Sequence, residues 1–360
     1  MKALNKYLIG RFSVWLLVVL AGFGAVAVLG DFLEMLSFAN RFDLSPGAAI
    51  GFTLQRLPLI ILDFLPFIFL FGTVFCLLRL SQTQELAVIR AAGLSVWQFL
   101  TPLLVFTFIT ASLVIAVLEP IGARSMASFS AKQAEVTGIK AKLSFSTDGI
   151  WFRETNEQNN YIVHSQKLDP QDAARLLNVS VTLIEADGTF HRQLEAGSAQ
   201  LFNGVFILQD VKIFTGTQLP QSQEQVILPT QLTLASIQNS FKPPRTIGLW
   251  KLPTYIDQAR AAGMDVSRHE AHFQSLLALP ILLLSMVMVA ACFSLPTGRN
   301  FSTSQTLGFS VLCGFILFLV NDVIGLMGEL NILPAIMASW MPALIALLLS
   351  VSYLITTEDG

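Results

Sequence analysis

Six long apolar segments constrain this chain more than any other feature of its sequence. Five of them carry no charged residue, and the other carries only Asp63. Each reaches the roughly 20 apolar residues that an α-helix needs to cross the hydrocarbon core of a bilayer. The sequence therefore predicts a polytopic α-helical membrane protein with six transmembrane helices. The predicted spans are 12–30, 57–78, 94–118, 273–298, 300–321 and 330–357.

The composition supports a membrane location. Of 360 residues, 53% are hydrophobic and only 13% are charged, which leaves too little polar surface to cover a soluble globule of this length. The first apolar segment is too long for the core of a signal peptide and has no small-x-small cleavage site before Asp31. We therefore expect it to be retained as a helix.

The basic residues of the short loops predict an orientation. An excess of lysine and arginine marks the cytoplasmic side of a membrane protein. Both termini are therefore expected in the cytoplasm, and three spans on either side place the middle of the chain in the periplasm of a bacterial cell. On the expected cytoplasmic side are Lys2, Lys6, Arg11, Arg79, Arg90 and Arg299, against Arg41 and Arg56 on the other.

The middle of the chain has the pattern of a β domain. Val179, Val181 and Leu183 alternate with polar residues, and Asp187-Gly188 and Asn203-Gly204 have the residue types of hairpin turns. Further strands are predicted at 149–154 and 160–166. None of the cysteines lies in this region, because Cys76, Cys292 and Cys313 all fall in predicted spans, so no disulfide framework is expected.

The predicted organisation has three parts. Residues 1–120 hold the first three spans and a short cytoplasmic helix near 82–93. Residues 121–268 form the inserted all-β domain, and 269–360 hold the last three spans.

The sequence contains no recognisable motif for binding or hydrolysing a nucleoside triphosphate. The phosphate-binding pattern G-x-x-x-x-G-K-[ST] is absent, so a partner would have to supply any ATP-driven step and the chain is expected to bind no cofactor. His269 and His272 are three residues apart, whereas a helical zinc site of the H-E-x-x-H type needs a spacing of four. We therefore expect neither a catalytic site nor a metal site.

Two alternative functions follow from other features. Asp63 and Asp322 lie within or beside predicted spans, where ionisable side chains are expensive and often functional. They suggest a proton-coupled secondary transporter, although both are expected toward the periplasmic side and not in a relay through the midplane. The β domain suggests a non-transporting membrane scaffold for periplasmic proteins.

A polar island at 81–102 interrupts the apolar sequence. As a helix it would place Glu85 and Ile89 on one stripe and Leu86, Arg90 and Gly93 on the next. Gly93 can end this helix and Ser95 can cap the one that follows. Its polar face is not basic enough for lipid head groups, which favours docking into a partner's groove.

Two groups of residues are candidates for lipid binding. Arg41 and Arg56 flank the first expected periplasmic loop, where a guanidinium can meet a lipid phosphate or act as an ordinary interfacial anchor. An apolar stripe in the fifth span could line a cavity for acyl chains or could face lipid or another helix. This stripe consists of Phe309, Leu312, Phe315, Ile316 and Leu319.

Three sequence stretches and the order of elements carry a family resemblance. They are "ELAVIRAAGLS" at 85–95, "DGIWFR" at 148–153 and the run from "LPTYIDQARAAGMDVSRHEAHF" into the fourth span. With three spans, a β domain and three spans, the chain resembles the LptF/LptG family of lipopolysaccharide export permeases over nearly its whole length. The regions "DGIWFR" and "SRHEAHF" are more similar to the LptG type.

The resemblance implies a permease subunit of an ABC transporter that moves lipopolysaccharide out of the inner membrane. It implies a homologous LptF-type subunit, a cytoplasmic LptB-type ATPase dimer that uses ATP, and periplasmic bridge proteins of the LptC and LptA types. The β domain would be jellyroll-like, and the first and fifth spans would form lateral gates. The coupling helix that enters the ATPase would contain Glu85, Leu86, Ile89, Arg90 and Gly93.

The sequence departs from the family at one place. Some members carry lysines for the lipid phosphates at the periplasmic end of the first span, where this chain has Asp31 and Glu34. That role is therefore not transferred, and it falls to Arg41, to Arg56 or to the partner subunit.

Overall fold

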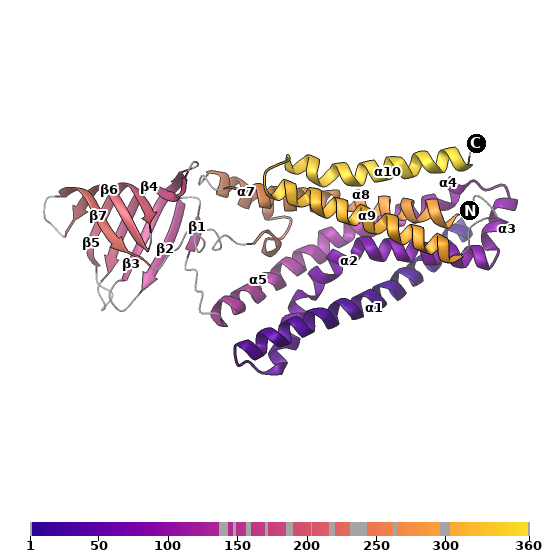
Figure 1. The fold of residues 1–360 in the computed structure, drawn as a ribbon, viewed down its shortest axis with the longest axis horizontal. Coiled ribbons are helices and arrows are strands. Elements are labelled where there is room, and N and C mark those ends of the chain that lie inside the picture. The colour runs from indigo at the N-terminus through magenta and orange to yellow at the C-terminus, as the bar shows by residue number, and fades with distance from the viewer. Residues whose placement is uncertain are drawn as a thin grey trace. The chain divides into compact units, whose positions relative to one another are not determined.

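The chain forms two compact units in a computed structural model (Figure 1). The first unit contains 1–130, 245–250 and 267–360, and the second contains 131–244 and 251–266. The structure describes residues 2–136, 143–146, 149–155, 160–169, 172–184, 190–202, 204–215, 220–230, 243–261, 265–295 and 303–358.

Within the described residues, six helices are long and apolar enough to cross a membrane, which confirms the predicted number. Four of them run past the ends of the predicted spans, to Arg41, Gln82, Val136 and, in helix α9, Glu329. The helices are α1 (Lys2–Arg41), α2 (Pro46–Gln82), α3 (Glu85–Ala91), α4 (Val96–Leu113), the π-helix η1 (Val114–Leu118), α5 (Glu119–Val136), the 3₁₀ turn η2 (Pro244–Thr246), α7 (Leu252–Ala261), α8 (Ser267–Ser294), α9 and α10 (Ala335–Glu358), with α9 beginning at Thr303.

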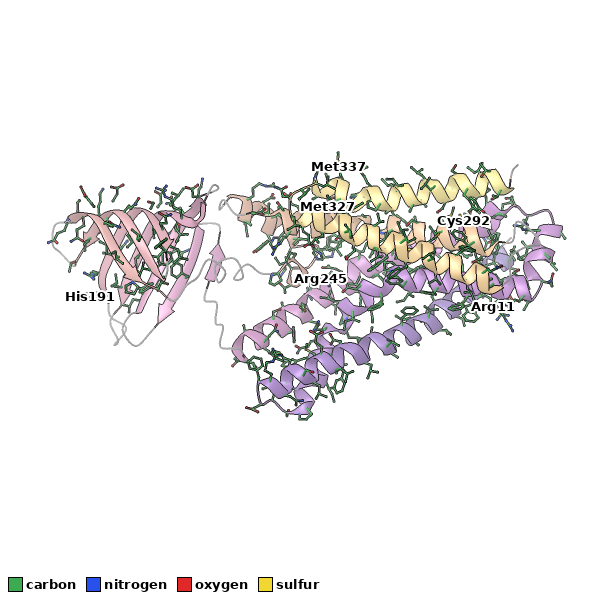
Figure 2. All side chains as sticks on the ribbon, in the orientation of Figure 1. Arg11, His191, Arg245, Cys292, Met327 and Met337 are labelled. Carbon is green, nitrogen blue, oxygen red and sulfur yellow. The ribbon has the colours of Figure 1, made fainter. Side chains whose placement is uncertain are left out.

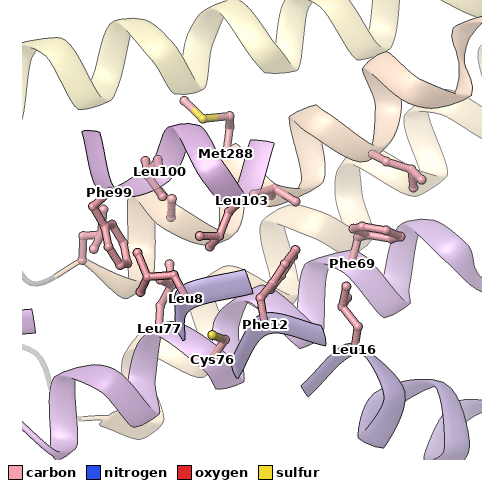
Figure 3. Close-up of a cluster of buried hydrophobic side chains, with 14 of the residues drawn as sticks. Leu8, Phe12, Leu16, Phe69, Cys76, Leu77, Phe99, Leu100, Leu103 and Met288 are labelled. Atoms are coloured by element: carbon pink, nitrogen blue, oxygen red, sulfur yellow. The ribbon is translucent and has the colours of Figure 1, made fainter. Parts of the chain in front are cut away.

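One apolar cluster joins helices from both halves of the sequence (Figure 3). Leu8 and Phe12 of α1 are buried in it beside Leu77 of α2, Leu100 of α4 and Met288 of α8. Aromatic rings add directional contacts, since Phe12 meets Phe69 and Phe106 edge to face at centroid distances of 6.3 and 5.8 Å. The bundle is therefore one packed unit that includes α1, α2, α4 and α8.

The helices differ widely in burial. Helix α8 is buried over most of its apolar length, whereas α1 and α9 leave most of theirs exposed. Glycines allow close packing where these outer helices meet α2, because a Cβ on Gly72 would lie 2.6 Å from Leu16 and one on Gly314 would overlap Leu70. The exposed faces of α1 and α9 are thus available to lipid or to another chain.

A π-helical turn marks the junction of α4 and α5. Pro120 has no N–H for the carbonyl of Ala116 four residues earlier, and the indole Nε1 of Trp250 donates to this carbonyl at 3.4 Å. The carboxylate of Glu119, which is 1% exposed, accepts the backbone N–H of Leu249 at 2.9 Å. The segment 245–250 is therefore held against the bundle by the Ala116 carbonyl and the Glu119 carboxylate.

The second unit contains an antiparallel sheet in which strands adjacent in sequence are adjacent in space. This confirms an inserted β domain, although helices α5 and α7 occupy parts of the predicted range 121–268. The described strands form a meander without the crossover of a Greek key. The predicted strands at 149–154 and 160–166 are present as β2 and β3. The strands are β1 (Leu143–Ser146), β2 (Gly149–Thr155), β3 (Asn160–Asp169), β4 (Asp172–Ile184), β5 (Phe190–Phe202), β6 (Val205–Phe214) and β7 (Gln221–Pro229).

Contacts between distant strands show that the sheet folds over on itself. The hydroxyl of Tyr161 in β3 donates to the carbonyl of Pro229 in β7 at 2.8 Å, although three strands separate them in the sheet. The rings of Phe152 in β2 and Phe206 in β6 stack at 5.5 Å. The folded sheet encloses apolar side chains, among them the buried Tyr161 and Phe206.

Of the four residues in the two predicted turns, Gly204 lies among the described residues. Phe202 pairs with Val205 in the β5–β6 hairpin, and Gly204 has the positive φ of 80° that favours glycine, whereas Asn203 lies outside the described residues. The other predicted turn, Asp187-Gly188, lies outside the described residues.

Candidate functional site

Helix α3 connects α2 to α4 at the end of the bundle where α1 begins and α10 ends (Figure 1). It is bounded by two left-handed residues, Gln84 with φ 61° and Gly93 with φ 78°. The hydroxyl of Ser95 accepts the N–H of Gln98 at 3.3 Å, and the Gln98 side chain accepts the N–H of Ser95 at 3.3 Å. This capping box confirms that Gly93 ends one helix and Ser95 begins the next.

The two faces of α3 have different environments. Leu86 and Ile89 are 5% and 9% exposed and belong to the bundle's apolar cluster. Val88 is 68% exposed, and Ala87 and Ala91 on the same side are exposed as well. Leu86 and Ile89 therefore anchor α3, and the small apolar side chains Ala87, Val88 and Ala91, which we call the outer face of α3, remain free of the bundle.

The carboxylate of Glu85 connects α3 to α1. The hydroxyl of Tyr7 donates to Oε2 of Glu85 at 2.6 Å, and Nε of Arg11 donates to the Tyr7 oxygen at 3.0 Å. The hydroxyl of Thr83 lies 3.0 Å from Oε1 of Glu85 and 2.9 Å from the Arg79 carbonyl, and its single proton bonds one of them at a time.

These contacts favour the charged form of Glu85. The hydrogen bond from Tyr7 lowers the pKa of this carboxyl below its ordinary value. Burial acts in the opposite direction and is the second-largest influence, and the hydroxyl of Thr83 and the positive charges of Arg11 and Arg79 lower the pKa further. The negative charge of Glu85 therefore interacts with Tyr7 and Arg11 of α1 and with Arg79 of α2.

The structure separates the five predicted coupling residues by position. Glu85 contacts α1, Leu86 and Ile89 lie in the core, Arg90 is half-buried and Gly93 forms the turn after the helix. None of these five residues belongs to the outer face of α3, which consists of Ala87, Val88 and Ala91.

The predicted lipid-binding arginines have different surroundings. Nε of Arg56 lies 3.1 Å from the buried Asp31, and its Nη1 lies 3.4 Å from Glu34. The guanidinium also lies 5.5 Å from the ring centroid of Phe129. Arg56 thus holds α2 to α1, whereas Arg41 is exposed in the last turn of α1.

The predicted apolar stripe lies on the outer surface of α9. Its five members are exposed, as are Val320, Val323 and Leu326 further along the helix. Gly314 faces inward between them and packs against Leu70. Within the described part of this chain the stripe thus forms an outer wall of the bundle. The stripe residues are Phe309, Leu312, Phe315, Ile316 and Leu319.

The two acids that suggested proton coupling, Asp63 and Asp322, lie on different helices and have different surroundings. Asp63 accepts from Nη1 of Arg245 at 2.8 Å, and both side chains are about half exposed. Figure 2 shows Arg245 toward the opposite end of the bundle from Arg11. Asp322 is exposed on α9. Asp63 therefore fastens the segment 245–250 to α2.

Sequence reasoning did not identify the contacts that Tyr7, Arg11 and Arg245 make. Tyr7 and Arg11 are four residues apart and so share one face of α1, which a search for helical pairs can find. Their partner Glu85 lies 78 residues from Tyr7, and Arg245 lies 182 residues from Asp63. No local pattern encodes such distances.

Together these features define a multi-pass helical membrane protein with an inserted antiparallel β domain and a short helix exposed between two spans. The sequence matches the family of lipopolysaccharide export system permeases LptF/LptG over residues 6–356, so the chain belongs to that family. It is 24% identical over 341 residues to the lipopolysaccharide export system permease protein LptG of Haemophilus influenzae, which covers 91% of this chain and 90% of that protein. The predicted resemblance is confirmed, and the chain is an inner-membrane permease of lipopolysaccharide export.

Proposed function

We propose that this chain is one transmembrane half of an ABC transporter that extracts lipopolysaccharide from the inner membrane. A homologous LptF-type subunit would complete the membrane part, and a cytoplasmic LptB-type ATPase dimer would supply the energy. Bridge proteins of the LptC and LptA types would receive the lipid in the periplasm. The family membership and the absence of a phosphate loop in the sequence support the assignment of ATP hydrolysis to a separate subunit.

The outer face of α3 is the observation that carries the proposal. A short helix whose large apolar side chains are buried in its own bundle is rigidly attached to that bundle, while Ala87, Val88 and Ala91 offer a small apolar surface. Such a face fits a hydrophobic groove on a partner. We therefore assign α3 and both termini to the cytoplasm and the β domain to the periplasm, as the distribution of basic residues predicts.

The exposed sides of α1 and α9 would face the partner subunit and the lipid. Five large apolar side chains of α9, from Phe309 to Leu319, provide a wall suited to acyl chains. Arg41 is the better candidate for a lipid phosphate, because Arg56 already faces two carboxylates.

A charge on the outer face of α3 tests the proposal. In proteoliposomes that contain both permease subunits and the ATPase, the native complex should release lipopolysaccharide to a soluble acceptor only with ATP. Val88→Glu should reduce co-purification of the ATPase at least about tenfold, because a carboxylate would enter an apolar interface. Ala3→Glu is the matched control, since it adds the same charge to an exposed position at the same end of the bundle.

Two results would contradict the proposal. One is a native complex that releases no lipid with ATP, which would favour a scaffold. The other is a Val88→Glu complex that retains the ATPase and its coupled lipid release.

A further inference from the structure

Tyr7 is a polar side chain for which the proposed function has no role. It projects from the second turn of α1, and its ring packs beside Arg11, whose guanidinium carbon lies 5.6 Å from the ring centroid. Its hydroxyl accepts from Arg11 and donates to Glu85, so a continuous chain of two hydrogen bonds runs from α1 to α3. Figure 2 places Arg11 at the end of the bundle that carries α3.

The positive charge of Arg11 and the negative charge of Glu85 strengthen these two hydrogen bonds. A hydroxyl that accepts from a guanidinium is polarised and becomes a better donor to a carboxylate. The bond from Tyr7 to Glu85, at 2.6 Å, has the ordinary length of a charge-assisted O–H···O bond. Leu8 and Phe12, one residue beyond Tyr7 and Arg11, are buried in the same apolar cluster as Leu86 and Ile89. The link therefore joins two helices that already share a core.

We propose that Tyr7 is a positioning residue that couples α1 to α3, so that a displacement of α3 by the ATPase reaches α1 directly as well as through α2. This inference rests on the proposed function. Helix α1 is the natural recipient of such a movement, because most of its apolar surface is exposed and not held by the rest of the bundle.

The test removes the hydroxyl and leaves the ring. In the reconstituted complex with both permease subunits and the ATPase, Tyr7→Phe should reduce the lipopolysaccharide released per ATP hydrolysed by roughly threefold to tenfold, the range for the net contribution of a typical intramolecular hydrogen bond. Co-purification of the ATPase should stay at the native level. Tyr353→Phe is the matched control, because it deletes a hydroxyl from a 46% exposed tyrosine near the end of α10.

Two further variants separate coupling from a general effect on the carboxylate. Thr83→Ala removes a contact to Glu85 that comes from the α2–α3 connection and should lower the ratio by less than Tyr7→Phe. In a Glu85→Ala background, Tyr7→Phe should have no further effect, since its acceptor is gone. A structural role of Tyr7 would instead add its cost in both backgrounds and lower the thermal stability of the chain.

The outcomes distinguish this inference from the proposed function. If the native complex releases no lipid with ATP, the proposed function is wrong. If the native complex is active and Tyr7→Phe matches it, or if Thr83→Ala equals Tyr7→Phe, then the inference is overturned and the proposed function stands.

Discussion

At the scale of the residue, the surroundings of Glu85 make a prediction about pH. Its folded-state pKa lies below the ordinary value of 4.5, chiefly because Tyr7 donates to it. A lowered pKa means that the carboxylate stabilises the α1–α3 contact fully above the ordinary value and that this contribution is lost as the pH falls through the lowered one. The contact should therefore persist at neutral pH and weaken only under acidic conditions.

The prediction can be measured on the carboxyl group itself. Carbon-13 NMR of glutamate side chains in detergent micelles should give Glu85 a titration midpoint below that of an exposed glutamate, and Tyr7→Phe should raise it. The groups that face Glu85 are Tyr7, Thr83, Arg11 and Arg79, of which the last three are unchanged in this variant. An unchanged midpoint would show that Tyr7 does not bind the carboxylate in solution.

At the scale of the element, packing of α9 on α2 depends on Gly314. A Cβ there would overlap the fully buried Leu70, whereas Gly308, on the same helix, has open space around it. Gly314→Val should therefore lower the free energy of unfolding by about 1–3 kcal/mol more than Gly308→Val, since both add the same β-branched side chain to a helix. Thermal unfolding of the two variants in one detergent would measure this. Equal stabilities would mean that α9 does not approach α2 this closely.

The elements also show what a sequence can and cannot predict. All six spans were predicted, because uninterrupted apolar runs of that length have few other solutions. The continuation of the third span into α5 was missed, since Pro120 and the polar residues after it imitate a helix end. For α3, helical periodicity identified two stripes, but only the packing shows that Leu86 and Ile89 face inward.

The same limit explains the site residues. The pairs Tyr7–Glu85 and Asp63–Arg245 depend on where separate helices meet, and that is decided by side-chain packing along their whole length. Similarly, Arg56 could be recognised as an interfacial cation from its position. Its pairing with Asp31 and Glu34 required the arrangement of α1 beside α2.

At the scale of the whole molecule, the segment 245–250 returns the chain from the second unit to the bundle. Glu119→Ala should lower the free energy of unfolding of the bundle by about 1–3 kcal/mol, because the N–H of Leu249 would stay buried without an acceptor. Glu119→Gln keeps an acceptor and should cost less. Glu329→Ala, at an exposed position, is the control. Chemical unfolding in mixed micelles would measure all three, and equal effects of Glu119→Ala and Glu329→Ala would contradict the assignment.

The meander order of the sheet has a consequence for how the β domain is made. Each strand pairs with the one just synthesised, so the sheet can grow hairpin by hairpin as the chain emerges. The bond between Tyr161 and Pro229 spans 68 residues and can form only after β7 has been added. The domain should therefore remain an open, water-accessible ribbon during most of its synthesis, and the last strand should close it in a single late step.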